Sequence, residues 1–308
     1  MMRQAKPMGK EQRGAALVLM FVTMVLVLLT VVMSALSNRN VHIAQARERQ
    51  EEMQRVKDVL LGFAVTDSLL YGRGPGRLPC PDINNSGADT CNTVNFRRLP
   101  QTLTLPSTSP LVLSTEYAGL DQQFWYAVTP AYKTSSTLLN SRSVGAFSID
   151  GVAGYAAVLL SPGEALSGQN RPHNTQADRY LESTNVGGVN FVSTGGVNVL
   201  NDTVLGITDK EIMSLTSVRV AQEVKRVLDV YYPANGNDYP LDLTSFQAAM
   251  INPTYGAAAW VASNDWLGGT FTYTRTGAGQ ARIQFESCAI QFSFGFGAAT
   301  IARSSTSC

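Results

Sequence analysis

The chain has 308 residues, a formal net charge of +1 and 15% charged residues. This balance gives no electrostatic reason to expect nucleic acid or an acidic substrate as a partner. The length is sufficient for one large or two modest folded domains. Two histidines and four cysteines, none with metal-finger spacing, exclude an ordinary zinc site.

The first predicted element is an apolar stretch from Gly14 to Leu36. Its 22 residues from Ala15 onward carry no charge, and about 20 apolar residues in a helix are enough to cross a bilayer. The residues before it are mostly basic, with one acid, Glu11; the basic ones are Arg3, Lys6, Lys10 and Arg13. This pattern predicts a single membrane-spanning helix with a cytoplasmic N-terminus and an exterior C-terminal domain.

Several interpretations of this stretch are open. A cleaved secretory signal fits worst, because its apolar core is normally about 7–15 residues long. A plain membrane anchor is the simplest interpretation. A third follows from residues 37–71, which contain no proline and predict an amphipathic continuation of the helix. Its apolar stripe consists of Met53, Val56, Leu60, Phe63 and Leu70.

A glycine-rich segment at residues 72–76 ends this helix and leads to Cys80. In an exported protein, the local pairs Cys80 with Cys91 and Cys288 with Cys308 predict two disulfide loops, with free thiols as the alternative. The alternation of Asp82, Asn84 and Ser86 is similar to the first half of a calcium loop. The twelfth position is a threonine instead of a glutamate, so an Asx-rich turn is the favoured interpretation.

Residues 95–205 predict an antiparallel sheet with long loops. Short runs rich in aromatic and β-branched residues alternate with Gly, Pro, Ser and Asn. We expect Trp125 and Tyr126 to be core residues. The polar run at residues 167–182 predicts an exposed excursion.

The C-terminal third predicts a second helix and further strands. Thr208 and Glu211 form a capping box at the start of a helix over residues 208–232, and strands are expected at 270–275 and 281–294. The sequence VKRVLD (224–229) is similar to VKDVLL (56–61). This similarity favours two helix-plus-sheet lobes related by duplication, although one short match is weak support.

Catalytic chemistry has little support. The two histidines, His42 and His173, are not near a recognisable nucleophile motif, and the turn around Ser161 lacks the Gly-x-Ser-x-Gly pattern. Asp178 and Glu182 are acids at short spacing, but many pairs of acids would satisfy that criterion. We therefore predict a protein that is not an enzyme and has no cofactor and no metal.

The N-terminal features together resemble the type IV prepilin and pseudopilin family. The boundary KEQRG-AALVLM resembles a prepilin peptidase site. The resemblance implies cleavage after Gly14, N-methylation of Ala15, a C-terminal disulfide loop and assembly into a filament. It also implies a bacterial inner-membrane location with a periplasmic domain, which reaches the cell surface once assembled.

One residue departs from the family pattern. Members usually carry glutamate at the fifth mature position, which here is Leu19. In the family this glutamate is thought to neutralise the amino terminus of a neighbouring subunit, and burying that charge unpaired would cost several kcal/mol. Leu19 therefore implies a minor subunit that acts at the tip or in initiation. The partners implied are other pilins or pseudopilins, prepilin peptidase and the inner membrane, with adhesion as a role for the exterior domain.

The predicted fold class is α+β, with a long pilin-type helix packed on an antiparallel sheet domain of one or two lobes. The expected segments are a leader (1–14), a transmembrane helix (15–36), an amphipathic extension (37–71), a first sheet-rich region (72–207) and a second helix-plus-sheet region (208–308). The alternative function is a single-pass, membrane-anchored periplasmic binding module or hydrolase. The sequence does not distinguish a pilus from a secretion or DNA-uptake system.

Overall fold

The computed structural model describes most of the chain in two compact units, Met1–Glu52 and Met53–Cys308. The described ranges are 10–71, 73–103, 111–112, 124–134, 138–171, 176–195, 199–268, 271–285, 290–298 and 301–304. Within them, side chains are described except at 10–17, 32, 34–43, 67–71 and 111–112.

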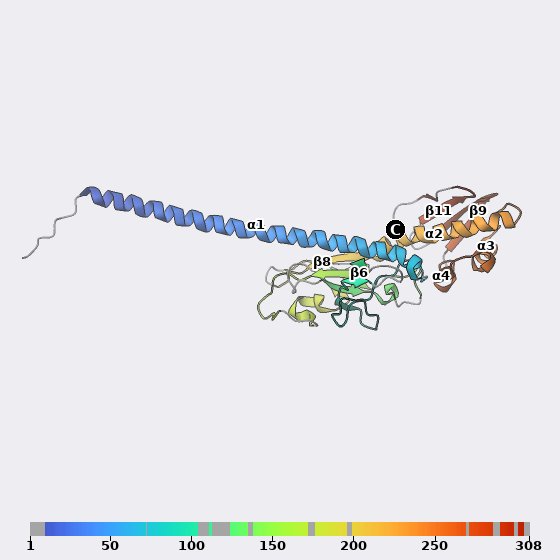
Figure 1. Cartoon of the computed structure of the whole chain (residues 1–308), viewed down its shortest axis with the longest axis horizontal. Coiled ribbons are helices and arrows are strands. Elements are labelled where there is room, and N and C mark those ends of the chain that lie inside the picture. Colours follow the sequence, from blue (N-terminus) through green and yellow to red (C-terminus); the bar gives the residue numbers. More distant parts are fainter. Residues whose placement is uncertain are drawn as a thin grey trace, which may run out of the picture. The chain divides into compact units, whose positions relative to one another are not determined.

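Helix α1 is formed by Lys10–Tyr71 and contributes to both units (Figure 1). Its apolar stretch with described side chains covers residues 18–31, which is 14 residues. Among the described residues, we find no helix whose length and apolar character would let it cross a membrane.

This finding corrects two predictions. The chain has the α+β class, with one curled sheet and a second sheet, but the expected long apolar pilin-type helix is wrong. The predicted single-pass inner-membrane location depended on a span at residues 15–36 and is wrong for the same reason.

The first sheet is built around the ten-residue strand β6 (Val152–Ser161). Strand β8 pairs with β6, while β4 and β5 pair with its later and earlier residues respectively. A tight turn at Asp150 and Gly151, both with positive φ, joins β5 to β6, as in two-residue hairpins. The other strands are β1 (Phe96–Arg98), β4 (Trp125–Val128), β5 (Phe147–Ile149), β7 (Asn190–Phe191) and β8 (Thr203–Thr208).

Strand β7 departs from the predicted antiparallel arrangement, because it pairs with β5 in parallel. It follows a long excursion that contains two short 3₁₀ helices, η2 (Ala177–Arg179) and η3 (Ser183–Val186). The excursion allows the chain to approach β5 from the same direction, which a short hairpin would not allow. A separate pair consists of β2 (Thr102–Leu103) and β3 (Leu111–Val112), and a 3₁₀ helix, η1, covers Pro130–Tyr132.

At strand β4 both faces of the first sheet are buried. Strand β4 is buried at all four positions, and alternate residues of a strand face opposite sides. Tyr126 and Val128 therefore belong to the main core, whereas Trp125 and Ala127 belong to a second cluster with Phe191. The predicted core role of Trp125 and Tyr126 is confirmed.

The second cluster is covered by part of the segment predicted as an exposed excursion. Ala177, Tyr180 and Leu181 are buried in it, so the prediction for residues 167–182 is wrong at these positions. Their spacing is too irregular to show strand or helix periodicity, although they cover an apolar sheet face.

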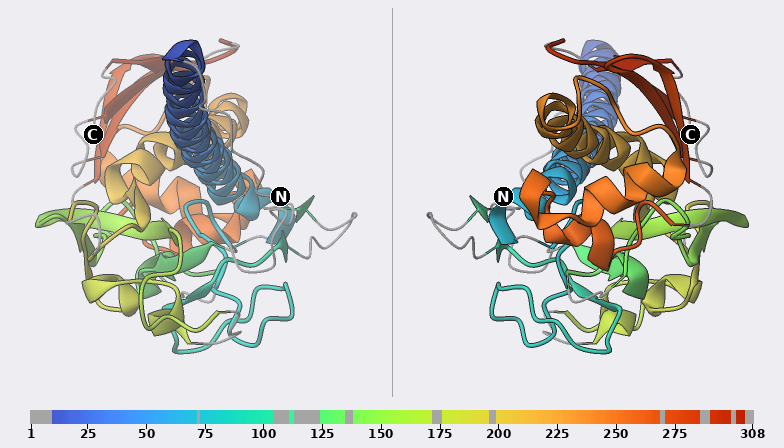
Figure 2. Two further views of the ribbon diagram at one scale, coloured as in Figure 1. Left: turned by 90° about the vertical axis from the view of Figure 1, so that its left-hand side faces the viewer. Right: turned by 90° about the vertical axis from the view of Figure 1, so that its right-hand side faces the viewer.

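The second half contains helix α2 (Asp209–Ala234), which starts with the predicted capping box of Thr208 and Glu211. Helix α2 contacts strands β6 and β8 of the first sheet and β11 of the second, so the two sheets share one core (Figure 2). The helices α3 (Leu243–Ile251), η4 (Pro253–Tyr255) and α4 (Ala259–Ser263) follow.

The second sheet is an antiparallel meander in the order β12-β11-β10-β9. Its strands are β9 (Phe271–Gly277), β10 (Gln280–Phe285), β11 (Ile290–Gly295) and β12 (Ala302–Arg303). The run predicted as one strand at 281–294 is two strands, β10 and β11, which pair with each other.

Candidate functional site

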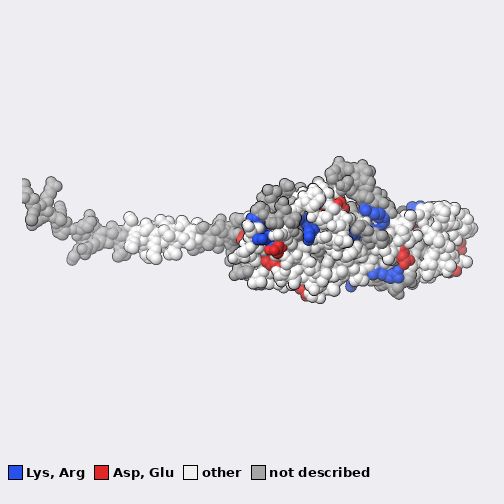
Figure 3. Space-filling view, turned by 90° about the horizontal axis from the view of Figure 1, so that it is seen from below, with Lys and Arg blue, Asp and Glu red and all other residues white. Residues whose placement is uncertain are grey.

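The candidate site is the stretch of α1 at residues 18–31. All of its residues except two threonines are large apolar residues, and each of these 12 is exposed. The exposed fractions range from 38% at Val25 to 75% at Met20, with no buried face among them. In Figure 3 the described part of this helix shows neither acidic nor basic side chains. Helices that are apolar on all sides are normally surrounded by other apolar surface.

The two threonines do not make this stretch polar. The hydroxyl of Thr23 donates to the carbonyl oxygen of Met20 at 2.9 Å, and that of Thr30 donates to Val27 at 2.8 Å. Both hydroxyls are therefore satisfied within the helix. A partner of this stretch would not have to supply hydrogen-bonding groups.

The later part of α1 behaves differently. From Met53 onward the described part of the predicted apolar stripe faces a core: Met53, Val56, Leu60 and Phe63 are all at most 4% exposed. The side chain of Leu70 lies outside the described set. Opposite charge holds this part in place, since Lys57 Nζ contacts Glu211 Oε1 at 2.6 Å and donates to the carbonyl oxygen of Gly206 at 2.8 Å. The same helix thus carries a covered segment and an apolar segment that is exposed.

The processing residues lie at the beginning of α1. Gly14 and Ala15 lie within its bounds, but their side chains are outside the described set. Leu19 is described and is 69% exposed. Its isobutyl group offers no charge to a neighbouring amino terminus.

The predicted disulfide between Cys80 and Cys91 is present, with Cα atoms 5.1 Å apart. The predicted pair Cys288 and Cys308 lies outside the described residues. Within the first loop, Asp82 is 3% exposed, and its carboxylate accepts backbone N–H groups from Asn84, Ser86 and Gly87. These bonds form the Asx-rich turn that was favoured over a calcium loop.

The structure describes only some of the weak catalytic candidates. His173 and the side chain of His42 lie outside the described set. Ser161 is 1% exposed at the end of β6. Asp178 is exposed, whereas Glu182 is buried and accepts hydrogen bonds from Gln169 and Asn201. In the described ranges there is no group of three or more His, Cys, Asp or Glu residues that could hold a metal.

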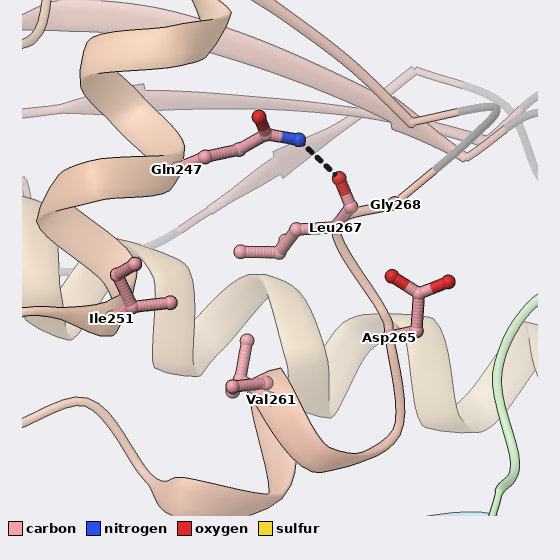
Figure 4. Close-up of a pocket in the computed structure, with 7 residues that line it drawn as sticks. Gln247, Ile251, Val261, Asp265, Leu267 and Gly268 are labelled. Atoms are coloured by element: carbon pink, nitrogen blue, oxygen red, sulfur yellow. Dashed lines mark hydrogen bonds between the residues drawn. The ribbon is translucent and has the colours of Figure 1, made fainter.

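A shallow pocket of about 190 Å³ lies between α3, α4 and the loop that follows α4 (Figure 4). Ile251, Val261 and Leu267 form its apolar wall, and the amide of Gln247 is used in a bond to the Leu267 carbonyl. The carboxylate of Asp265 at its edge is paired with Arg142 at 2.5 Å. The pocket lacks a set of converging polar groups of the kind that orients a small ligand.

Comparison with protein-family models, with curated proteins and with solved structures finds no match.

Proposed function

We propose that the protein is a non-enzymatic subunit that assembles with other subunits through residues 18–31 of α1, in the manner of a minor type IV pilin or pseudopilin. The observation that supports this proposal most strongly is the exposure of 12 large apolar side chains in an uncharged helical stretch. Burial of such a side chain stabilises a complex by about 1.5–3 kcal/mol when it is complete.

The distribution of these side chains indicates the kind of partner. A groove on one partner would cover one side of a helix and leave the opposite side exposed. Here Leu19, Phe21 and Leu26 are all more than half exposed, and the other large apolar residues of the stretch are at least 38% exposed. A surrounding set of uncharged, apolar helices from other subunits covers such a surface most completely.

Leu19 supports a minor role within such an assembly. A subunit without a carboxylate at this position does not neutralise a buried amino terminus of a neighbour, and an unpaired buried charge is costly. Repeated stacking is therefore disfavoured, whereas a position at the tip or in initiation does not require this contact.

Site-specific photo-crosslinking in the native cells tests the assembly. A photoreactive phenylalanine analogue replaces Phe21 in the full chain, and we expect adducts with N-terminal helices of other subunits. Leu26→Arg should reduce these adducts at least tenfold, because it places a charge in an apolar interface. Val199→Arg, at a residue that is 66% exposed in the second unit, is the matched control and should leave them unchanged. Adducts with lipid alone, or no dependence on Leu26→Arg, would contradict the proposal.

Mass spectrometry of the N-terminus tests the family resemblance separately. A mature chain that starts at N-methylated Ala15 supports processing after Gly14. An intact Met1, or normal processing of a Gly14→Leu variant, counts against it.

A further inference from the structure

Two buried carboxyl groups meet beneath the cover of the first sheet. Asp202 precedes β8 and is 6% exposed, and Glu182 precedes η3 and is 8% exposed. The backbone N–H of Glu182 donates to Asp202 Oδ2 at 3.0 Å, and the N–H of Asn201 donates to Glu182 Oε2 at 3.2 Å. The carboxylate of each acid thus accepts a hydrogen bond from a backbone N–H at or next to the other acid.

The donors around this pair are neutral. Asp202 Oδ2 also accepts from the side-chain amide of Asn185 at 3.0 Å, and Glu182 Oε1 accepts from that of Gln169 at 2.8 Å. Asp202 Oδ1 is buried without a hydrogen-bond donor. Across the described ranges, neither carboxylate has an ion-pair partner.

Two ionised carboxylates are unfavourable in such surroundings, because desolvation and mutual repulsion both oppose the second charge. Burial, reinforced by the neighbouring Glu182, raises the pKa of Asp202 from 3.8 to about 7, although bonds from the Glu182 N–H and Asn185 act in the opposite direction. A proton between the acids would supply the donor that Asp202 Oδ1 lacks.

The hydrogen bonds of this pair join three segments that are distant in sequence. Gln169 belongs to the loop after β6, Glu182 and Asn185 to the segment of η3, and Asp202 to the start of β8. Asn185 extends the connection, since its amide donates to the carbonyl of Val192 and its oxygen accepts from the Val192 N–H. These segments adjoin Tyr180 and Leu181, which cover Trp125 in the second cluster.

We propose that Asp202 and Glu182 form a proton-dependent latch, in which a shared proton holds these segments against the first sheet and its loss releases them. The latch is strongest in acid. The folded state favours the protonated form of Asp202. The stabilisation that the latch provides is therefore fully present below about pH 4 and is lost as the pH rises towards 7.

Other charged groups near the latch are already engaged. The guanidinium of Arg171 donates to Gln169 Oε1 and to the carbonyls of Gly163, Arg179 and Tyr180. The guanidinium of Arg179 donates to Gln176 Oε1. The raised pKa of Asp202 is therefore due mainly to its burial, and the neighbouring Glu182 adds to it.

Hydrogen exchange of the full chain, measured from pH 5 to 8 and corrected for the intrinsic exchange rate, tests this proposal. Protection of residues 180–192 in the wild type should fall by up to about tenfold per pH unit on approach to pH 7. Asp202→Asn should remove this dependence, because its amide donates to Glu182 without a titrating proton. Glu182→Gln should also remove the pH dependence of protection, because it too removes a titrating carboxyl group. This variant replaces Asp202→Asn if that variant folds poorly.

Asp178→Asn is the matched control, since it removes an exposed carboxylate on the same segment, and it should behave like the wild type. An equal pH dependence in the wild type and in both latch variants would overturn the proposal. The proposal would also be overturned if Ca²⁺ restored protection at pH 8 in the wild type alone, because a bound cation would then take the place of the shared proton.

Discussion

At the scale of single residues, Lys57 shows how one side chain connects distant parts of the fold. Its ammonium contacts the carboxylate of Glu211, at the start of α2, and the carbonyl of Gly206 in β8. The carboxylate of Glu211 makes a second contact, because it also accepts a hydrogen bond from the backbone N–H of Thr208. A helical apolar stripe predicted the buried face of this part of α1, but no local signal indicated which acid Lys57 would reach.

We expect Lys57→Met to lower the free energy of unfolding by about 1–3 kcal/mol, because the Gly206 carbonyl loses a charged donor. Chemical denaturation measures this loss. Arg47→Met is the control, since Arg47 and Glu51 form a pair that is 81% and 67% exposed and should contribute less than about 1 kcal/mol. An equal effect of both variants would contradict this assignment.

The same contact has a pH dependence with a definite sign. Burial acts to raise the pKa of Glu211, but hydrogen bonds from Lys57 and Thr208 outweigh it and hold the pKa below 4.5. The stabilisation is therefore present above about pH 4.5 and is lost as the pH falls through the lower pKa of the folded state. Lys57→Met should weaken this acid-side loss.

At the scale of elements, α2 was predicted because its start signal is local. Thr208 Oγ1 accepts from the Glu211 N–H at 3.1 Å and completes the capping box. Thr208→Ala should cost about 1 kcal/mol by leaving that N–H without its acceptor, whereas Thr208→Ser should retain most of the stability. Thermal denaturation of the two variants checks this, and equal melting temperatures would show that the cap contributes little.

The related sequences VKDVLL and VKRVLD also have comparable surroundings. Val56 and Leu60 in α1, and Val224 and Leu228 in α2, are each 0% exposed. For α1 the pattern predicted correctly that Val56 and Leu60 face the core, because the helical period of 3.6 fixes the buried side once a helix forms. It did not predict that both helices would share one core, since the contacts that join them are far apart in sequence.

At the scale of the whole molecule, Asn264 joins loops of the two halves of the second unit. Its side-chain oxygen accepts from Arg77 at 2.7 Å and from the Leu139 N–H at 3.1 Å, and its backbone carbonyl accepts from Asn140. Asn264 is only 2% exposed, so water cannot replace it as a hydrogen-bond partner.

We expect Asn264→Ala to destabilise the fold by about 3 kcal/mol, because it removes a buried side-chain oxygen that accepts from both the Arg77 guanidinium and the Leu139 N–H. Calorimetry should show a single transition at lower temperature. Asn235→Ala is the control, because its bonds to Tyr231 and Tyr255 are exposed, and it should shift the transition much less. A variant Asn264→Ala with unchanged stability would contradict the joining role.

The sequence by itself determined the α+β class, the capping box, the buried stripe of α1, the core role of Trp125 and Tyr126 and the Cys80–Cys91 disulfide. Each depends on residues close together in the chain, where periodicity, capping and cysteine spacing act directly. The tertiary structure decided the parallel pairing of β7, the burial of Tyr180 and Leu181, the contact of Lys57 with Glu211 and the meeting of Asp202 with Glu182. These features depend on which distant surfaces pack together and which side chains that packing excludes from water, and no local pattern encodes either.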